Sequence, residues 1–153
     1  GWYDAGLRAI GLTHYGLNRY GGGTAVTDGL APGASELLKR IEKLGIALDL
    51  THLSDRAFEE ATAIFGGRVL ASHQNVRQLV PDQRQFTDEQ LRLVIERDGV
   101  VGAAFDAWML QPNYVRGESK PCVTLETVVD HIQYVCDLAG NARHAAIGTD
   151  LDG

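Results

Sequence analysis

Short apolar runs alternate with amphipathic stretches along the whole chain, and this alternation limits the fold more than any other feature. The apolar runs, which we expect to be strands, cover residues 7–12, 46–50, 68–71, 99–105 and 144–148. Brief, continuous apolar runs are typical of parallel strands that are covered on both faces. The sequence therefore predicts an α/β fold, either an open doubly wound sheet or a (β/α)8 barrel.

The stretches between the apolar runs have apolar residues at helical spacing. Helices are predicted at residues 34–44 and 54–65, after Thr87, and at residues 124–139. Ser54 is placed to cap the second helix, and Thr87 with Gln90 fits a capping box for the third. The last helix is expected to bury an apolar face made of Leu125, Val128, Val129, Ile132, Val135 and Cys136.

The composition restricts the function classes. The chain has 153 residues, of which 44% are hydrophobic and 22% charged, which suits one globular domain. The net charge is −6 and the basic residues are scattered, so we expect no nucleic-acid partner. No apolar run approaches the roughly 20 residues of a membrane span. Cys122 and Cys136 form neither a CxxC motif nor a disulfide framework, which is consistent with a reducing compartment such as the cytoplasm.

The two ends of the chain predict that a larger domain continues beyond them. The first residue is Gly1, and no charged-then-apolar signal segment follows it. The last residues have a buried-strand pattern followed by a turn. A strand at that position without a covering helix would leave an apolar face in water. We therefore expect residues 1–153 to be a single incomplete segment of a larger domain.

Reactive side chains follow the expected strands directly. The first, second and third runs are followed by His14, His52 and His73, and the fifth by Asp150 and Asp152. In both candidate folds, ligands bind at the carboxyl ends of the strands. Because the carboxyl ends of parallel strands lie on one face, we expect these side chains to converge there.

The other two histidines are placed differently. His144 lies at the amino end of the last strand, on the opposite face, so we expect it to be structural or exposed. His131 lies beside Asp130 on the polar face of a helix, where a solvated side chain is the usual outcome.

The spacing of two histidines suggests a metal. His52 and His73 are one strand–helix unit apart, so their strands should be neighbours, about 4.8 Å from each other. Two imidazoles on neighbouring strands can reach one metal, and imidazole with carboxylate is a common donor set for hydrolytic metals. The alternative is that each histidine is a satisfied polar residue, and spacing alone leaves both readings open.

Other candidates are weaker. The Gly21–Thr24 segment lacks the Lys-Ser/Thr pair of a phosphate loop, which favours a flexible loop. Ser72 has no nucleophile elbow around it. Asp106 ends the fourth run and could face a pocket. Three residues after the fourth run either line a pocket or pack a loop, namely Trp108, Met109 and Tyr114.

Taken together, these segments resemble the renal or membrane dipeptidase family of zinc peptidases. The matching segments, in the family's order, are Leu12-Thr13-His14, Asp49-Leu50-Thr51-His52, Ala71-Ser72-His73 with Arg84 eleven residues on, and Gly148-Thr149-Asp150-Leu151-Asp152-Gly153. The resemblance implies a partial (β/α)8 TIM-like barrel of about five parallel strands, corresponding to roughly the fourth through eighth strands.

The resemblance also implies roles for individual residues. His52 and His73 look like the two histidine ligands of one zinc. His14 is similar to the histidine that contacts the substrate near its carbonyl oxygen. Arg84 looks like the arginine that holds the free carboxylate of the dipeptide, and Asp150 like the carboxylate that handles protons. The implied function is zinc-dependent hydrolysis of a small dipeptide by a metal-activated water.

Several features depart from the family pattern. Arg84 is followed by Gln85 where the family usually has Asn, and Ser72-His73 is followed by Gln74 where it has Ser. The family's His-x-Asp pair and bridging Glu, which complete its two-zinc site, correspond to no part of this chain. We therefore expect the segment to be inactive alone, and we leave a homodimer of the parent protein open.

Two alternatives remain. One is another metal-dependent barrel hydrolase of the amidohydrolase type. Many of those bridge their metals with a carboxylated strand-end lysine, whereas Lys39, Lys43 and Lys120 lie in expected helices and a loop. The other is a non-catalytic binding relative that keeps the fold. The histidines, Arg84 and Asp150 argue against decay of the parent site.

Overall fold

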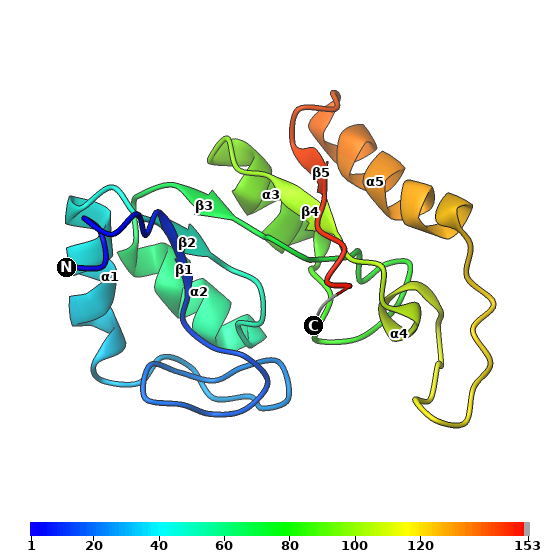
Figure 1. Ribbon diagram of the computed structural model, residues 1–153, viewed down its shortest axis with the longest axis horizontal. Coiled ribbons are helices and arrows are strands. Elements are labelled where there is room, and N and C mark those ends of the chain that lie inside the picture. Colours follow the sequence, from blue (N-terminus) through cyan, green and yellow to red (C-terminus); the bar gives the residue numbers. More distant parts are fainter. Residues whose placement is uncertain (152–153) are drawn as a thin grey trace. The chain divides into compact units, whose positions relative to one another are not determined.

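The computed structural model describes residues 1–151 and is an α/β structure with parallel strands (Figure 1). The chain divides into two compact units. The first unit comprises residues 1–70, and the second unit begins at Ala71. Asp152, one of the sequence candidates, lies outside the described residues.

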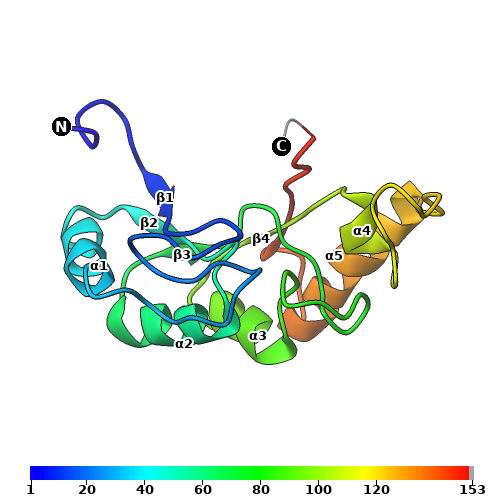
Figure 2. The ribbon, with the colours of Figure 1, turned by 90° about the horizontal axis from the view of Figure 1, so that it is seen from below.

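The first unit is a three-stranded parallel sheet with two helices. Its elements are β1 (Ala9–Gly11), α1 (Ala34–Lys43), β2 (Ala47–Asp49), α2 (Asp55–Ile64) and β3 (Val69–Leu70). The strand order is β1-β2-β3, with Ile10 opposite Leu48 and Leu48 opposite Val69. Because consecutive strands are neighbours, both crossover helices lie on one face of the sheet (Figure 2).

The second unit contains α3 (Asp88–Glu96), β4 (Val101–Ala103), α4 (Ala107–Leu110), α5 (Leu125–Ala139) and β5 (Ala145–Ile147). Strands β4 and β5 are parallel, with Val101 opposite Ala145 and Ala103 opposite Ile147. A parallel bridge also joins Ala71 to Val101. In this unit α3 and α5 lie on the same side of the strands (Figure 2).

The core of the first unit lies between the sheet and its helices. Leu48 is fully buried at the centre of β2, and the helices contribute Leu38, Ile41 and Phe58. Burying side chains of this size is the dominant favourable term in folding, roughly 1.5–3 kcal/mol each. The second unit has its own cluster of Ala103, Leu110 and Val128, against which Phe105, Val123 and Ile132 pack.

The expected strands and helices are present, but the strands are shorter than their apolar runs. The run at residues 99–105 contains only the three residues of β4. The reason is local: the backbone N–H of Ala104 donates to Oδ1 of Asn75 at 3.0 Å instead of to a neighbouring strand. The short helix α4 was not expected from the sequence, because four residues are too few to show a helical period.

The buried face of α5 differs from the expected one. Val128, His131 and Val135 are buried, whereas Leu125 is 69% exposed and Val129 is 55% exposed. The expectation of a solvated His131 is therefore wrong. Its Nδ1 accepts a hydrogen bond from the backbone N–H of Val76 at 3.0 Å, which satisfies a polar group that the loop would otherwise bury.

Residues 1–151 contain no helix that combines the length and the apolar character needed to cross a membrane.

Candidate functional site

His14 and His52 lie together in the first unit, at the carboxyl ends of β1 and β2. The centroids of their imidazole rings are 4.2 Å apart. The hydroxyl of Thr13 donates to the backbone carbonyl of His52 at 2.9 Å, which ties the two strand ends to each other. Tyr15, which was not a candidate from the sequence, contacts both histidines. The centroid of its ring lies 4.4 Å from that of His14 and 4.9 Å from that of His52.

His52 has an unusual backbone. It is 4% exposed, and its φ is +67°, in the left-handed region that residues with a Cβ rarely adopt. The turn before it is stabilised by Asp49, whose Oδ1 accepts from the backbone N–H of Thr51 at 3.1 Å. A left-handed histidine costs on the order of 1 kcal/mol and persists where the surrounding structure imposes it, often at functional sites.

The glycine-rich segment Gly21–Thr24 packs against these strand ends. It is buried, and Gly23 bridges to Leu53 while the N–H of Thr24 donates to the carbonyl of His14 at 3.2 Å. A Cβ at Gly23 would collide with that same carbonyl oxygen. The segment is thus buried and hydrogen-bonded beside His14, and it is not the flexible loop that its composition suggested.

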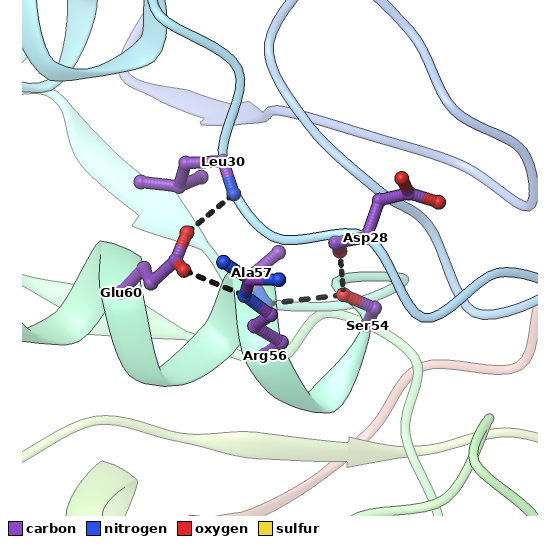
Figure 3. Close-up of polar contacts among 6 residues, drawn as sticks. All are labelled: Asp28, Leu30, Ser54, Arg56, Ala57 and Glu60. Carbon is purple, nitrogen blue, oxygen red and sulfur yellow. Dashed lines mark hydrogen bonds and ion pairs between the residues drawn. The ribbon is translucent and has the colours of Figure 1, made fainter.

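Helix α2 anchors the far end of this glycine-rich loop (Figure 3). Ser54 accepts from the N–H of Ala57 at 3.0 Å, as the predicted N-cap, and its hydroxyl also donates to the carbonyl of Asp28 at 2.6 Å. Glu60 accepts from the N–H of Leu30 at 2.6 Å. That backbone bond is the main reason why the pKa of Glu60 lies below its ordinary value.

The second unit places His73 immediately after the Ala71 bridge. The hydroxyl of Ser72 and Nδ1 of His73 are 2.8 Å apart and share a hydrogen bond. A ring held through Nδ1 would bind a metal through Nε2, an arrangement typical of metal-binding histidines. Ser72 therefore orients the histidine, in line with the absence of a nucleophile motif around it.

Arg84 is buried in the loop after His73, with 2% of its surface exposed. Its Nη1 donates to Oε1 of Gln74 at 2.7 Å, and its Nη2 donates to the carbonyl of His73 at 2.9 Å. Its backbone N–H donates to Oδ1 of Asp82 at 2.7 Å. The guanidinium is thus held beside His73 by fixed partners, and it pins its own loop.

Asp106 follows β4 and Asp150 follows β5, and the charge of Asp150 acts on Asp106. Burial raises the pKa of Asp106 above its ordinary value, and the charge of Asp150 raises it further. The charges of Arg116, Arg84 and His73 act in the opposite direction.

Two glycines allow the strand ends of the second unit to approach closely. A Cβ at Gly102 or at Gly148 would collide with the carbonyl oxygen of Ser72. The segment Gly148-Thr149-Asp150 therefore needs a glycine at position 148 for close packing. Asp150 itself has a φ of +56°. Of the remaining candidates, His144 is structural, because its Nδ1 lies 2.8 Å from the carbonyl of Gly99 in a buried position.

Of the three candidates after β4, Met109 is buried, whereas Trp108 and Tyr114 are partly buried. Met109 is fully buried, and its carbonyl accepts from the side chains of Asn75 at 3.2 Å and Gln85 at 2.8 Å. Met109 therefore packs the loop. Asn75 also bonds to Ala104 and so fixes the end of β4, a role for which the sequence had no signal.

The sequence predicted that the strands before His52 and His73 are neighbours, and the pairing of β2 with β3 confirms it. His14 and His52 belong to the first unit, whereas His73, Arg84 and Asp150 belong to the second. Within residues 1–151, no group of three or more His, Cys, Asp or Glu side chains is arranged to hold a metal. Imidazoles at strand ends, one of them oriented by a hydroxyl, still fit part of a metal donor set.

Known proteins resemble this chain over its whole length. The family model for membrane dipeptidases, peptidase family M19, matches residues 1–153. A Klebsiella pneumoniae protein, "Uncharacterized protein in pqqA 5'region", is 32% identical over 99% of this chain and 58% of its own length. Dipeptidase aclJ of Aspergillus oryzae is 30% identical over 99% of this chain and 36% of its own length.

Solved structures of metallopeptidases also match this chain. The crystal structure of a metallopeptidase from Rhodobacter sphaeroides, liganded with a phosphinate mimic of the dipeptide L-Ala-D-Ala, matches with a TM-score of 0.88 and 27% identity. The match covers 99% of this chain and 44% of that one. The M19 dipeptidase AC matches equally well, with a TM-score of 0.88. The chain therefore spans about half the length of proteins whose family it shares, and it belongs to the membrane dipeptidase family.

Proposed function

We propose that the protein containing this chain is a metal-dependent dipeptidase that hydrolyses the peptide bond of small dipeptides. The observation that carries the proposal is the pair of His14 and His52, held in ring contact at neighbouring strand ends of a chain that matches the family from residue 1 to 153. The dipeptide mimic bound by the Rhodobacter sphaeroides relative supports the substrate class.

The fold of the complete domain would be a (β/α)8 barrel, of which this chain forms a part. The sequential order β1-β2-β3 supports this architecture, because a doubly wound sheet needs a reversal of strand order. Within each unit, the location of the helices on one side of the strands also supports it. The carboxyl ends of the strands would then form the catalytic face.

His52 and His73 would hold the metal, and zinc is the metal that we propose. Neutral imidazole is a preferred zinc ligand, and the hydroxyl of Ser72 fixes the ring of His73 through Nδ1. A bound zinc supplies Lewis acidity and lowers the pKa of water toward roughly 7. The remaining ligands of a two-zinc site would come from residues outside this chain.

The other site residues would act on the substrate. His14, beside the histidine ligand, can donate a hydrogen bond to the carbonyl oxygen as negative charge develops on it. Arg84 can hold the free carboxylate of the dipeptide, because its guanidinium is a planar donor fixed in position by Gln74. Asp150 can accept a proton from water and return it to the leaving amine.

Metal content and hydrolysis by the full-length protein test the proposal together. Replacing His73 with Ala should lower the bound zinc and abolish dipeptide hydrolysis. His144→Asn, which changes a buried histidine at the opposite strand ends, should leave the zinc content unchanged. Hydrolysis of a cyclic amide with no hydrolysis of dipeptides would favour the amidohydrolase-type alternative, and binding without turnover would favour a non-catalytic relative. Gel filtration of the same sample tests the homodimer, which we keep as a proposal.

A further inference from the structure

Asp106 and Asp150 occupy equivalent places on neighbouring strands. Strands β4 and β5 lie side by side (Figure 1). Strand β4 ends at Ala103 and β5 at Ile147, and these two residues are paired. Beyond the paired residues the two chains remain bonded, because the N–H of Phe105 donates to the carbonyl of Thr149 at 3.0 Å, one residue past the register of the strands. The next residue on each chain is an aspartate. Both aspartates therefore follow the same end of the strand pair.

The Asp106 carboxylate has no counter-charge bonded to it. Asp106 is the N-cap residue of α4, yet its side chain makes no capping hydrogen bond. Across residues 1–151 its carboxylate forms no hydrogen bond and no ion pair. Arg116, whose charge acts to lower the pKa of Asp106, is exposed. A half-buried carboxylate beside a second carboxylate is costly unless a positive group approaches it.

The charges around Asp106 indicate which part of a ligand would approach it. The side chain of Gln85, the neighbour of Arg84, donates to the carbonyl of Met109 in α4, the helix that begins after Asp106, so the loop that carries Arg84 lies beside this helix. The charges of Arg84 and His73 also act to lower the pKa of Asp106. The free carboxylate belongs to the C-terminal residue of a dipeptide. The nearest variable part of the substrate is therefore the side chain of that same residue.

We propose that Asp106 is a specificity-determining residue that favours dipeptides with a positively charged side chain on the C-terminal residue. The inference rests on the proposed dipeptidase function. An ammonium or guanidinium group there would form an ion pair with the Asp106 carboxylate, whereas a carboxylate on the substrate would be repelled. A neutral side chain of the same length would be neither attracted to the Asp106 carboxylate nor repelled by it.

Three substrates and three variants of the full-length, metal-loaded protein test this inference. The substrates are Ala-Lys, Ala-Met and Ala-Glu, and the variants are Asp106→Asn, Asp106→Glu and the control Glu118→Gln, which removes an exposed charge from the following loop. For Asp106→Asn we expect kcat/KM for Ala-Lys to fall roughly five- to tenfold and that for Ala-Glu to rise, with Ala-Met nearly unchanged. Asp106→Glu should keep the order Lys over Glu, and Glu118→Gln should change nothing.

The outcomes separate this inference from the proposed function. An equal loss on all three substrates, or no change in their ratios, would overturn the role of Asp106 while leaving the dipeptidase function intact. If the unmodified protein hydrolyses none of them, calorimetric binding of phosphinate mimics of Ala-Lys and Ala-Glu decides. A preference for the lysine mimic that Asp106→Asn removes would support the inference, and equal or absent binding would overturn it.

Discussion

Gln74 and Arg84 hold each other through a reciprocal pair of hydrogen bonds. Nη1 of Arg84 donates to Oε1 of Gln74 at 2.7 Å, and Nε2 of Gln74 donates to the carbonyl of Arg84 at 2.6 Å. Both residues are almost fully buried. Gln74 stands where the family usually has Ser, and here it is the partner that fixes the arginine. The part of the loop that carries Arg84 is therefore tied back to Gln74, the residue that directly follows His73.

Replacing Arg84 should affect both stability and substrate binding. Arg84→Ala removes two charge-assisted bonds, each worth about 1.5–3 kcal/mol, and leaves Gln74 buried without its donor. We expect kcat/KM for a dipeptide to fall by roughly one to two decades with metal content unchanged, and Arg84→Lys to recover only part, because an ammonium lacks the planar fork. The measurement compares kcat/KM of the unmodified protein and of Arg84→Ala for a dipeptide and for its C-terminal amide. Equal penalties on both would leave Arg84 with the loop-pinning role alone.

Gly23 should be intolerant of any side chain. A Cβ at this position would meet the carbonyl oxygen of His14 and so displace the strand end that carries this histidine. We expect Gly23→Ala to lower the unfolding temperature of the full-length protein and to reduce kcat for dipeptides. Gly16→Ala is the matched control, because a Cβ there meets open space. Similar unfolding curves for the two variants would contradict the packing argument.

Ser54 should contribute to the stability of the glycine-rich loop as well as of α2. Its hydroxyl is bonded on both sides, to the N–H of Ala57 and to the carbonyl of Asp28. Loss of a cap costs about 0.5–2 kcal/mol, and the unpaired carbonyl adds to this. We expect Ser54→Ala to lower the free energy of unfolding by about 2 kcal/mol in urea. Ser35→Ala, in the first turn of α1, serves as the comparison. A Ser54→Ala effect no larger than that of Ser35→Ala would count against the double role.

His131 should make the protein less stable in mild acid. Burial lowers its pKa from 6.5 to about 4, and the nearby charge of Asp130 opposes this only in part. Between these two values the unfolded chain binds a proton that the folded protein does not. The stabilisation from a neutral His131 is therefore complete above pH 6.5, decreases as the pH falls toward 4, and reaches a total loss of about 3 kcal/mol.

The variant His131→Asn tests this pH dependence. The side-chain oxygen of Asn can accept from the N–H of Val76 in place of Nδ1, and it does not titrate. Urea unfolding at pH 7.5 and pH 5 should show a smaller difference in free energy for the variant than for the unmodified protein. An identical pH dependence in both would mean that other groups dominate.

Much of the fold was readable from the sequence because the signals are local. The apolar runs and the helical periods identified the strands and four helices, and Ser54 and Thr87 marked two helix starts correctly. The placement of His14, His52 and His73 at strand ends followed from the same pattern. Parallel pairing alone then predicts that such residues share a face, whatever the details of packing.

Other features depend on contacts between residues far apart in the chain, and only the tertiary structure decided them. His131 is buried because a backbone N–H 55 positions away needs an acceptor, a demand that no helical period reveals. The need for glycine at position 23 comes from the approach of the His14 carbonyl. Hydrophobic patterning determines which segments become strands and helices, whereas hydrogen-bond satisfaction and close packing, which are set by the three-dimensional neighbours, determine which polar residues are buried and what they hold.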